Sequence, residues 1–159
     1  MLSWRALIAT TLDVVAILSS VMVAGLIVFL VIARYVLELS VVGLHEVILL
    51  FAVFLYMFGA IIASKKREHL TVDWLQQRLA SERAKAWHDL TVAAISLIVT
   101  GFFLAWTYWM LDWGLKRPQV TPGLRIPLWI PQLAILAAAV GCSLYALRDL
   151  IDAIRRLGR

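Results

Sequence analysis

The sequence predicts an all-α membrane protein, in which four transmembrane helices form a single domain. Hydrophobic residues make up 63% of the 159-residue chain and charged residues only 16%, which is far from the composition of soluble domains. The hydrophobic residues gather in four long runs, each bounded by charged residues. A soluble protein of this size could not bury so much apolar surface, whereas a bilayer removes the need to bury it.

Each uncharged run is long enough to cross the hydrocarbon layer of a membrane. The runs cover residues 14–33, 47–64, 90–111 and 126–147. About 20 residues at a helical rise of 1.5 Å span a core of roughly 30 Å. Backbone groups must pair within each segment in lipid, and the runs lack the alternation of barrel strands, so helices are expected. With their flanks, the spans are placed at about 12–34, 41–64, 90–111 and 127–147.

Lysine and arginine are unevenly shared between the two sides of the membrane. Eleven lie before the first span, between the second and third, and after the fourth, whereas four lie in the other two connections. The positive-inside rule therefore predicts that both termini and the middle connection are cytoplasmic. The net charge of +5 then suits anionic membrane lipids as partners. The basic residues form no groove with stacking aromatics, so no nucleic-acid partner is expected.

The middle connection predicts a short cytoplasmic amphipathic helix at about residues 71–80. Its apolar residues lie at helical spacing on one face, with Trp74 beside them: Val72, Leu75 and Leu79. Such a helix beside a bilayer lies flat among the lipid headgroups. The alternative is a solvated connector. Ser81, followed by Glu82, predicts the N-cap of a new helix that continues into the third span.

The outer connection, residues 112–127, contains three prolines and two glycines, which predict a constrained, mostly extended path with turns. It carries three basic residues on the outer side, Lys116, Arg117 and Arg125. A rigid basic loop suits a docking surface for another protein. An ordinary short connector explains the same residues, and the residues alone do not separate the two interpretations.

Two acids approach the spans from opposite sides of the membrane. Glu46 lies at the outer entry to the second span, and Asp13 lies near the inner end of the first. For Glu46 the alternatives are an ion or proton site, a polar contact to another helix or subunit, and snorkelling to water. We favour the polar contact, and we expect Asp13 to be interfacial. Transporters place coupling sites near the midplane, and no such feature is visible in this sequence.

Catalytic and cofactor patterns are missing from the sequence. The three histidines, His45, His69 and His88, do not face one another at similar depth, so they do not suit haem ligation. Signatures of metal hydrolases, acyl transferases and nucleotide hydrolases are also missing. We therefore expect no enzyme and no cofactor, and a supporting role beside a larger membrane partner.

Three stretches together resemble a known family. Residues 33–36 (ARYV) precede the acid Glu46, residues 66–73 read KREHLTVD, and residues 121–129 read TPGLRIPLW. In order and spacing they resemble the small membrane subunit (DctQ type) of tripartite ATP-independent periplasmic, or TRAP, transporters. The family often carries a tryptophan and two consecutive acids at the start of the second helix, whereas this chain has Gly43-Leu44-His45-Glu46.

The resemblance implies a sodium-driven importer of carboxylate-bearing organic acids in the bacterial inner membrane. Its partners would be a large multi-span TRAP permease subunit, which would hold the sodium, and a periplasmic solute-binding protein. We expect this chain to scaffold the large subunit and to help dock the binding protein. The candidate residues for the subunit interface are Arg34, Glu46, Trp74 and Leu75. Those for docking the binding protein are Lys116, Arg117 and Arg125.

Two other functions are kept as alternatives. A self-sufficient small multidrug exporter also has four helices, but its class is shorter, with tight loops and an acid well inside the first helix. The second alternative is the membrane anchor subunit of a redox enzyme, which would reveal itself by a haem absorption band. The transported substrate and the helix face that meets a partner do not follow from the sequence.

Overall fold

The computed structural model describes residues 4–39, 41–66 and 81–157, and within these ranges most residues belong to four helices. The helices are α1 (Trp4–Tyr35), α2 (Leu44–Lys66), α4 (Glu82–Lys116) and α5 (Trp129–Leu157). Each is long and apolar enough to cross a membrane. This confirms the predicted all-α membrane fold. The amphipathic helix expected at residues 71–80, with Trp74 and Leu75, lies outside the described residues.

The helix bounds can be compared with the expected spans. Spans 12–34 and 90–111 fall inside α1 and α4, whereas spans 41–64 and 127–147 start slightly before α2 and α5. The 35 residues of α4 extend about 50 Å, which is longer than the hydrocarbon layer is thick. Part of α4 therefore projects beyond the membrane, and the exact limits of the crossings stay a prediction.

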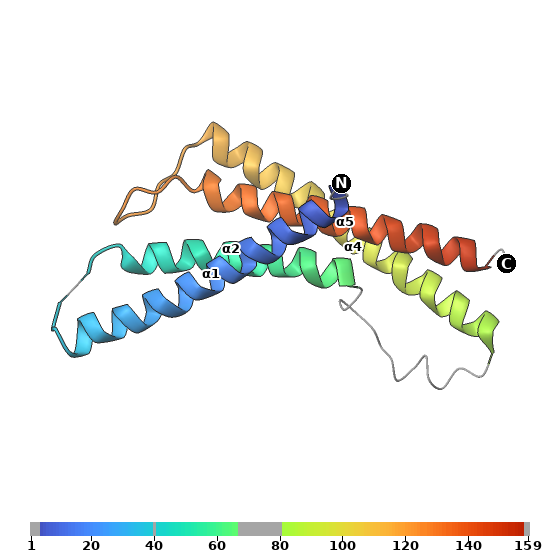
Figure 1. Cartoon of the computed structure of the whole chain (residues 1–159). Helices are drawn as coiled ribbons and strands as arrows, with labels where there is room; N and C mark the ends of the chain where they lie inside the picture. Colours follow the sequence, from blue (N-terminus) through green and yellow to red (C-terminus); the bar gives the residue numbers. More distant parts are fainter. Residues whose placement is uncertain (1–3, 40, 67–80, 158–159) are drawn as a thin grey trace.

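The four helices form two hairpins arranged as an open row. Helix α1 packs on α2, α2 packs on α5, and α5 packs on α4, and these are the extensive helix contacts among the described residues. Figure 1 shows the described parts of the two connections, residues 36–39 with 41–43 and residues 117–128, at the same end of the molecule. Since α2 and α5 are central, α1 and α4 each have a broad face that no other described helix covers.

Packing between α1 and α2 follows from the spacing of residues on α1. The buried residues Leu12, Ser19 and Ala33 lie on one face together with half-buried residues at alternating steps of four and three: Ala16, Val23, Leu26 and Leu30. This is the spacing of helices that cross at a shallow angle with interdigitating side chains. The rest of α1 between residues 10 and 35 is exposed, apart from Val15.

Small residues on α5 let α2 approach closely. Ala138 joins Leu12 and Ile61 in a buried cluster where three helices meet. One turn further along, a Cβ atom built on Gly141 would lie only 3.1 Å from Cγ1 of Ile61. Small side chains at such positions allow the van der Waals contact that drives helix association in lipid. Gly141 therefore sets the distance between the two central helices.

Polar side chains inside the spans also bridge neighbouring helices. Ser64 of α2 hydrogen-bonds to Cys142 of α5. The Ser143 hydroxyl of α5 donates to the carbonyl oxygen of Thr100 in α4 at 3.3 Å. Such contacts add about 0.6–2 kcal/mol each in membrane proteins. They fix the rotation of α5 between its two neighbours.

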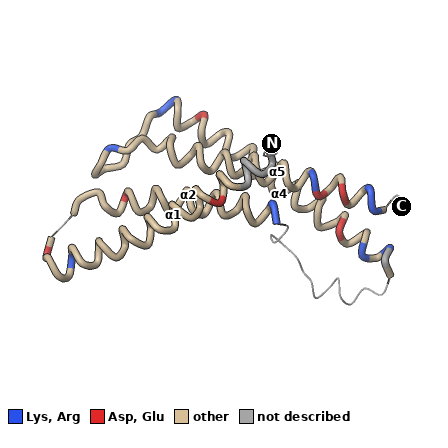
Figure 2. Tube along the Cα trace, viewed as in Figure 1, with Lys and Arg blue, Asp and Glu red and all other residues tan. Residues whose placement is uncertain are grey.

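Charged residues concentrate at the two ends of the helices, as Figure 2 shows, with long uncharged segments between them. The end that holds the last turn of α2, the start of α4 and the last turns of α5 is rich in basic residues. This matches the charge asymmetry on which the predicted orientation depends. The orientation itself stays a prediction.

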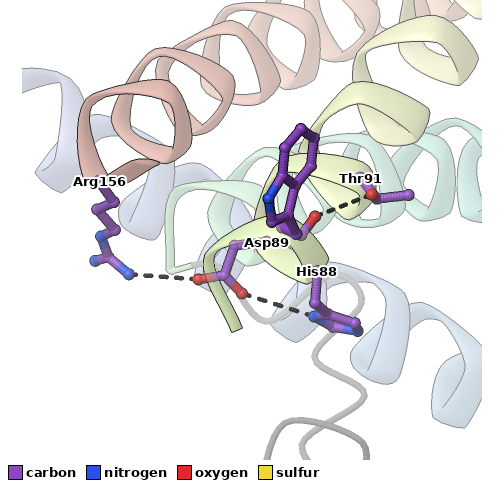
Figure 3. A network of polar contacts seen from close by, with 5 residues as sticks. His88, Asp89, Thr91 and Arg156 are labelled. Atoms are coloured by element: carbon purple, nitrogen blue, oxygen red, sulfur yellow. Dashed lines mark hydrogen bonds and ion pairs between the residues drawn. The ribbon is translucent and has the colours of Figure 1, made fainter. Parts of the chain in front are cut away.

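A polar network links α4 and α5 at this basic end (Figure 3). Nη1 of Arg156 lies 3.5 Å from Oδ2 of Asp89, and Nδ1 of His88 lies 3.7 Å from Oδ1 of the same carboxylate. The Thr91 hydroxyl donates to the carbonyl oxygen of Trp87 at 2.9 Å. The Arg156 side chain is 62% exposed, so water screens its ion pair.

We expect the substitution Arg156→Gln to change stability little. Exposed ion pairs contribute about 0–1 kcal/mol, because solvation and side-chain entropy offset most of the attraction. Thermal unfolding of the purified chain in detergent should therefore give nearly the same midpoint for the variant and the wild type. A large loss of stability would show that this pair is shielded from water.

Candidate functional site

The connection between α4 and α5 ends in a tight turn, residues 121–126, which we call the outer turn. The amide of Thr121 donates to the carbonyl of Ile126 at 3.0 Å, and the amide of Arg125 donates to the carbonyl of Thr121 at 3.1 Å. The amide of Ile126 also donates to the Thr121 hydroxyl oxygen at 3.0 Å. Arg125 adopts a left-handed backbone conformation with φ +54°. The turn is therefore constrained, in agreement with its proline and glycine content.

Glu46 at the start of α2 holds the outer turn. Its Oε1 accepts from the amide of Gly123 at 2.7 Å, and its Oε2 accepts from the amide of Leu124 at 2.9 Å. The Thr121 hydroxyl also hydrogen-bonds to the Glu46 side chain. These charge-assisted bonds are short and directional. One carboxylate thus connects the two halves of the molecule across 77 residues of sequence.

Two glycines let the outer turn approach α2. Gly43 has φ +85°, which is the left-handed region that favours glycine. A Cβ atom there would lie 2.5 Å from Cγ of Leu124, so the Leu124 side chain rests directly on the Gly43 backbone. A Cβ atom on Gly123 would lie 2.9 Å from Oε1 of Glu46 and 3.1 Å from Cα of Gly43. The contact between the two loops therefore depends on both glycines.

An apolar groove of about 800 Å³ runs beneath the outer turn, between α2 and the start of α5. Its walls include Leu49, Leu50 and Val53 of α2 and Pro131 of α5. The residues with polar side chains in its lining are His45, Glu46 and Thr121. The groove lacks the convergent set of polar groups by which a site orients a polar substrate.

The three basic residues expected at a docking surface differ in their surroundings. Nζ of Lys116 pairs with Oδ2 of Asp112 at 2.7 Å, so its charge is partly balanced. The guanidinium of Arg117 lies 5.9 Å from the centre of the Trp113 ring, and Arg125 is exposed on the outer turn. All three lie at the same end of the molecule as the outer turn, but not as one uniform cationic patch.

The described residues offer no clear catalytic arrangement. Within residues 4–39, 41–66 and 81–157, no group of three or more His, Cys, Asp and Glu residues could hold a metal ion. The carboxylate of Glu46 is engaged by backbone amides of the outer turn, which makes it a structural acceptor in this conformation. What this end of the molecule offers is a braced, partly basic surface.

A comparison with protein families then decides the assignment. The family model described as "Tripartite ATP-independent periplasmic transporters, DctQ component" matches residues 22–156. The chain belongs to the DctQ family. No curated protein matches this DctQ chain individually.

Membership identifies this DctQ chain as a small subunit of a TRAP transporter, which works with other TRAP subunits. It is a transporter component and not an enzyme. With its four potential membrane-crossing helices, it is a multi-pass membrane protein. The resemblance on which the sequence prediction depended is therefore confirmed.

Two of the four residues predicted for a subunit interface of this DctQ chain lie in the described part, Arg34 and Glu46. Arg34 lies at the end of α1 with its guanidinium 6.0 Å from the centre of the Tyr35 ring, and Glu46 binds the outer turn. Trp74 and Leu75 lie outside the described residues. The residues that contact Glu46 or allow that contact were not predicted from the sequence. A usable signal was the Thr-Pro-Gly stretch, because a turn has backbone amides that can donate to a carboxylate. These residues are Gly43, Thr121, Gly123 and Leu124.

Proposed function

We propose that this chain is the small permease subunit of a sodium-coupled TRAP transporter that imports carboxylate-bearing organic acids with a periplasmic solute-binding protein. It scaffolds the large multi-span permease subunit, which carries sodium and substrate, and it contributes part of the surface on which the binding protein docks. In this proposal the transporter lies in the bacterial inner membrane, and both termini of this chain are in the cytoplasm. Membrane lipids are its other partners.

The single observation that carries the docking role is the braced outer turn. Loops usually move more than the elements that they connect, whereas this one is tied to α2 by Glu46 and to itself by backbone bonds. A fixed loop loses little conformational entropy when a partner binds, which favours a docking surface. Arg117 and Arg125 then offer positive charge to acidic groups of the binding protein.

We expect the double substitution Arg117→Glu/Arg125→Glu to lower uptake severalfold at limiting concentrations of binding protein. Reversed charges repel acidic groups on the partner and slow association. The dependence of uptake on salt should also weaken, since screening acts mainly on the attraction between exposed charges. Uptake of labelled substrate into proteoliposomes that hold both permease subunits measures both effects.

The control is Arg155→Glu, which reverses an exposed charge in the last turn of α5 at the opposite end of the molecule. It should leave uptake and its salt dependence unchanged. Docking at the outer turn is rejected if the double variant transports like the wild type, or if both variants lose uptake equally. Saturating binding protein should restore the rate of the double variant, because only association is impaired.

A further inference from the structure

Helix α1 carries an acid on a face that no other described helix covers. Asp13 is exposed, while its neighbour Leu12 is buried against Ile61 and Ala138. In the described part of the chain, no hydrogen bond or ion pair involves the side-chain carboxylate of Asp13. The carboxylate therefore points away from its own fold.

The buried cluster fixes the depth of Asp13. Leu12 packs in the same buried cluster as Ile61 of α2. Ile61 lies four residues before Lys65, which corresponds to about 6 Å along the helix. With Lys65 at the membrane surface, Asp13 therefore lies about 6 Å further into the membrane than Lys65 does. Lysine and arginine reach the headgroups from such depths on long stems, but the single methylene of aspartate does not. Acids inside a membrane span are rare and commonly pair with a group of opposite charge, so a cation of a neighbouring helix is the partner that suits Asp13 best.

The same side of α1 is shaped for close contact with a helix. Residues 13, 17, 20 and 24 follow steps of four, three and four, so they lie along one side. Ser20 and Ala24 are exposed there next to the larger Ile17, and small residues let a second helix approach. The open face of α4 differs from this side of α1 because it carries large aromatic side chains. Phe102, Trp106 and Trp109 are each more than 60% exposed, as is typical of surfaces that meet lipid and its headgroups.

We propose that the side of α1 with Asp13, Ser20 and Ala24 is the docking surface for the large permease subunit, whose transmembrane helix places a Lys or Arg against Asp13. This inference rests on the proposed function, because it takes that subunit as the partner. A second copy of this chain does not supply the cation through α1, since residues 6–33 contain no Lys or Arg. A two-fold contact through this face would instead bring the two Asp13 carboxylates together.

The first test is co-purification of the two permease subunits from cells that express both. Asp13→Asn should lower the recovery of the large subunit by about tenfold, as the loss of one partner of a desolvated charge pair does. The matched control is Glu38→Gln, an exposed acid just beyond the other end of α1. This control should recover the large subunit like the wild type. Equal recovery with Asp13→Asn, or equal loss in both variants, overturns the inference.

A second test maps the face directly and does not depend on the charge. In a Cys142→Ala background, Ser20→Cys on α1 and Ile98→Cys on α4 each carry a cysteine-reactive photo-crosslinker in the assembled complex. We expect adducts with the large subunit from position 20 and not from position 98. Adducts at position 98 alone, adducts between two copies of this chain, or lipid adducts alone at position 20 each contradict the proposal.

The outcomes separate this inference from the proposed function. If the wild-type chain does not co-purify with a TRAP permease subunit at all, the proposed function fails. If the wild type co-purifies and Asp13→Asn does so equally well, the proposed function stands and the α1 docking surface fails. Size-exclusion profiles of the variants in detergent show that each variant chain is folded.

Discussion

Replacing Gly43 with alanine is expected to release the outer turn and to destabilise the protein. The backbone of Gly43 has φ +85°, and a residue with a side chain in a sparsely populated conformation costs about 1–3 kcal/mol. The new Cβ atom would also lie 2.5 Å from Cγ of Leu124, so the turn must move away from α2. Movement of the turn stretches both bonds from Glu46 to the backbone amides.

Limited trypsin digestion measures this release. Arg125 lies in the outer turn, and the bond after it should be cut several times faster in Gly43→Ala than in the wild type. Glu46→Gln should act in the same direction with a smaller effect, because an amide keeps the shape of the carboxylate but loses its charge and one acceptor oxygen.

The control for this prediction is Gly101→Ala in α4. A Cβ atom at Gly101 would meet nothing within 4 Å, and alanine favours a helix over glycine by up to about 1 kcal/mol. This variant should be as stable as the wild type or slightly more stable, with unchanged cleavage at Arg125. If Gly43→Ala is also cut at the wild-type rate, the outer turn is not held by its contact with α2.

The helices could be predicted because the lipid environment allows only backbone conformations that satisfy their hydrogen bonds internally. An uncharged run of about 20 residues in a bilayer must pair its backbone internally, so the four runs were sufficient to predict four helices. The start of α4 was also predictable. The helix begins at Glu82, directly after Ser81, although the Ser81 side chain makes no capping hydrogen bond.

The order of the helices in the row could not be predicted. Soluble helices reveal their packed face by an apolar stripe, whereas these helices are apolar all round. Small residues give only a weak signal of packing. Gly59 and Gly141 occur in similar small-residue patterns, yet a Cβ atom on Gly59 would meet nothing within 4 Å, whereas one on Gly141 would press on Ile61.

The candidate site was predicted in part. The interpretation favoured for Glu46 was a polar contact to another helix or subunit, and in the structure its carboxylate binds the outer turn of the same chain. The partner lies 77 residues away, a separation that periodicity does not bridge. The three basic residues were predicted as one surface, but the local partner of Lys116, the acid Asp112 four residues before it, was overlooked.

Enlarging Gly141 to leucine is expected to have the second large effect, because it separates the two central helices. The first added carbon already lies 3.1 Å from Cγ1 of Ile61, and leucine adds further carbon atoms beyond it, so we expect overpacking. Overpacking of this kind costs about 1–3 kcal/mol. It also strains the hydrogen bond between Ser64 and Cys142 and the nearby cluster of Leu12, Ile61 and Ala138. Thermal unfolding of the purified chain in detergent measures the loss.

Two further variants test the stated cause. Gly59→Leu adds the same side chain to α2 where a Cβ atom meets nothing, so it should leave the unfolding midpoint nearly unchanged. Ile61→Ala leaves a cavity when made alone, but it provides space for leucine at position 141. The double variant Gly141→Leu/Ile61→Ala should therefore be more stable than the sum of the two single losses predicts. Strict additivity would mean that Gly141 and Ile61 do not determine the spacing of α2 and α5, and the central contact of the row would then have to lie elsewhere along these helices.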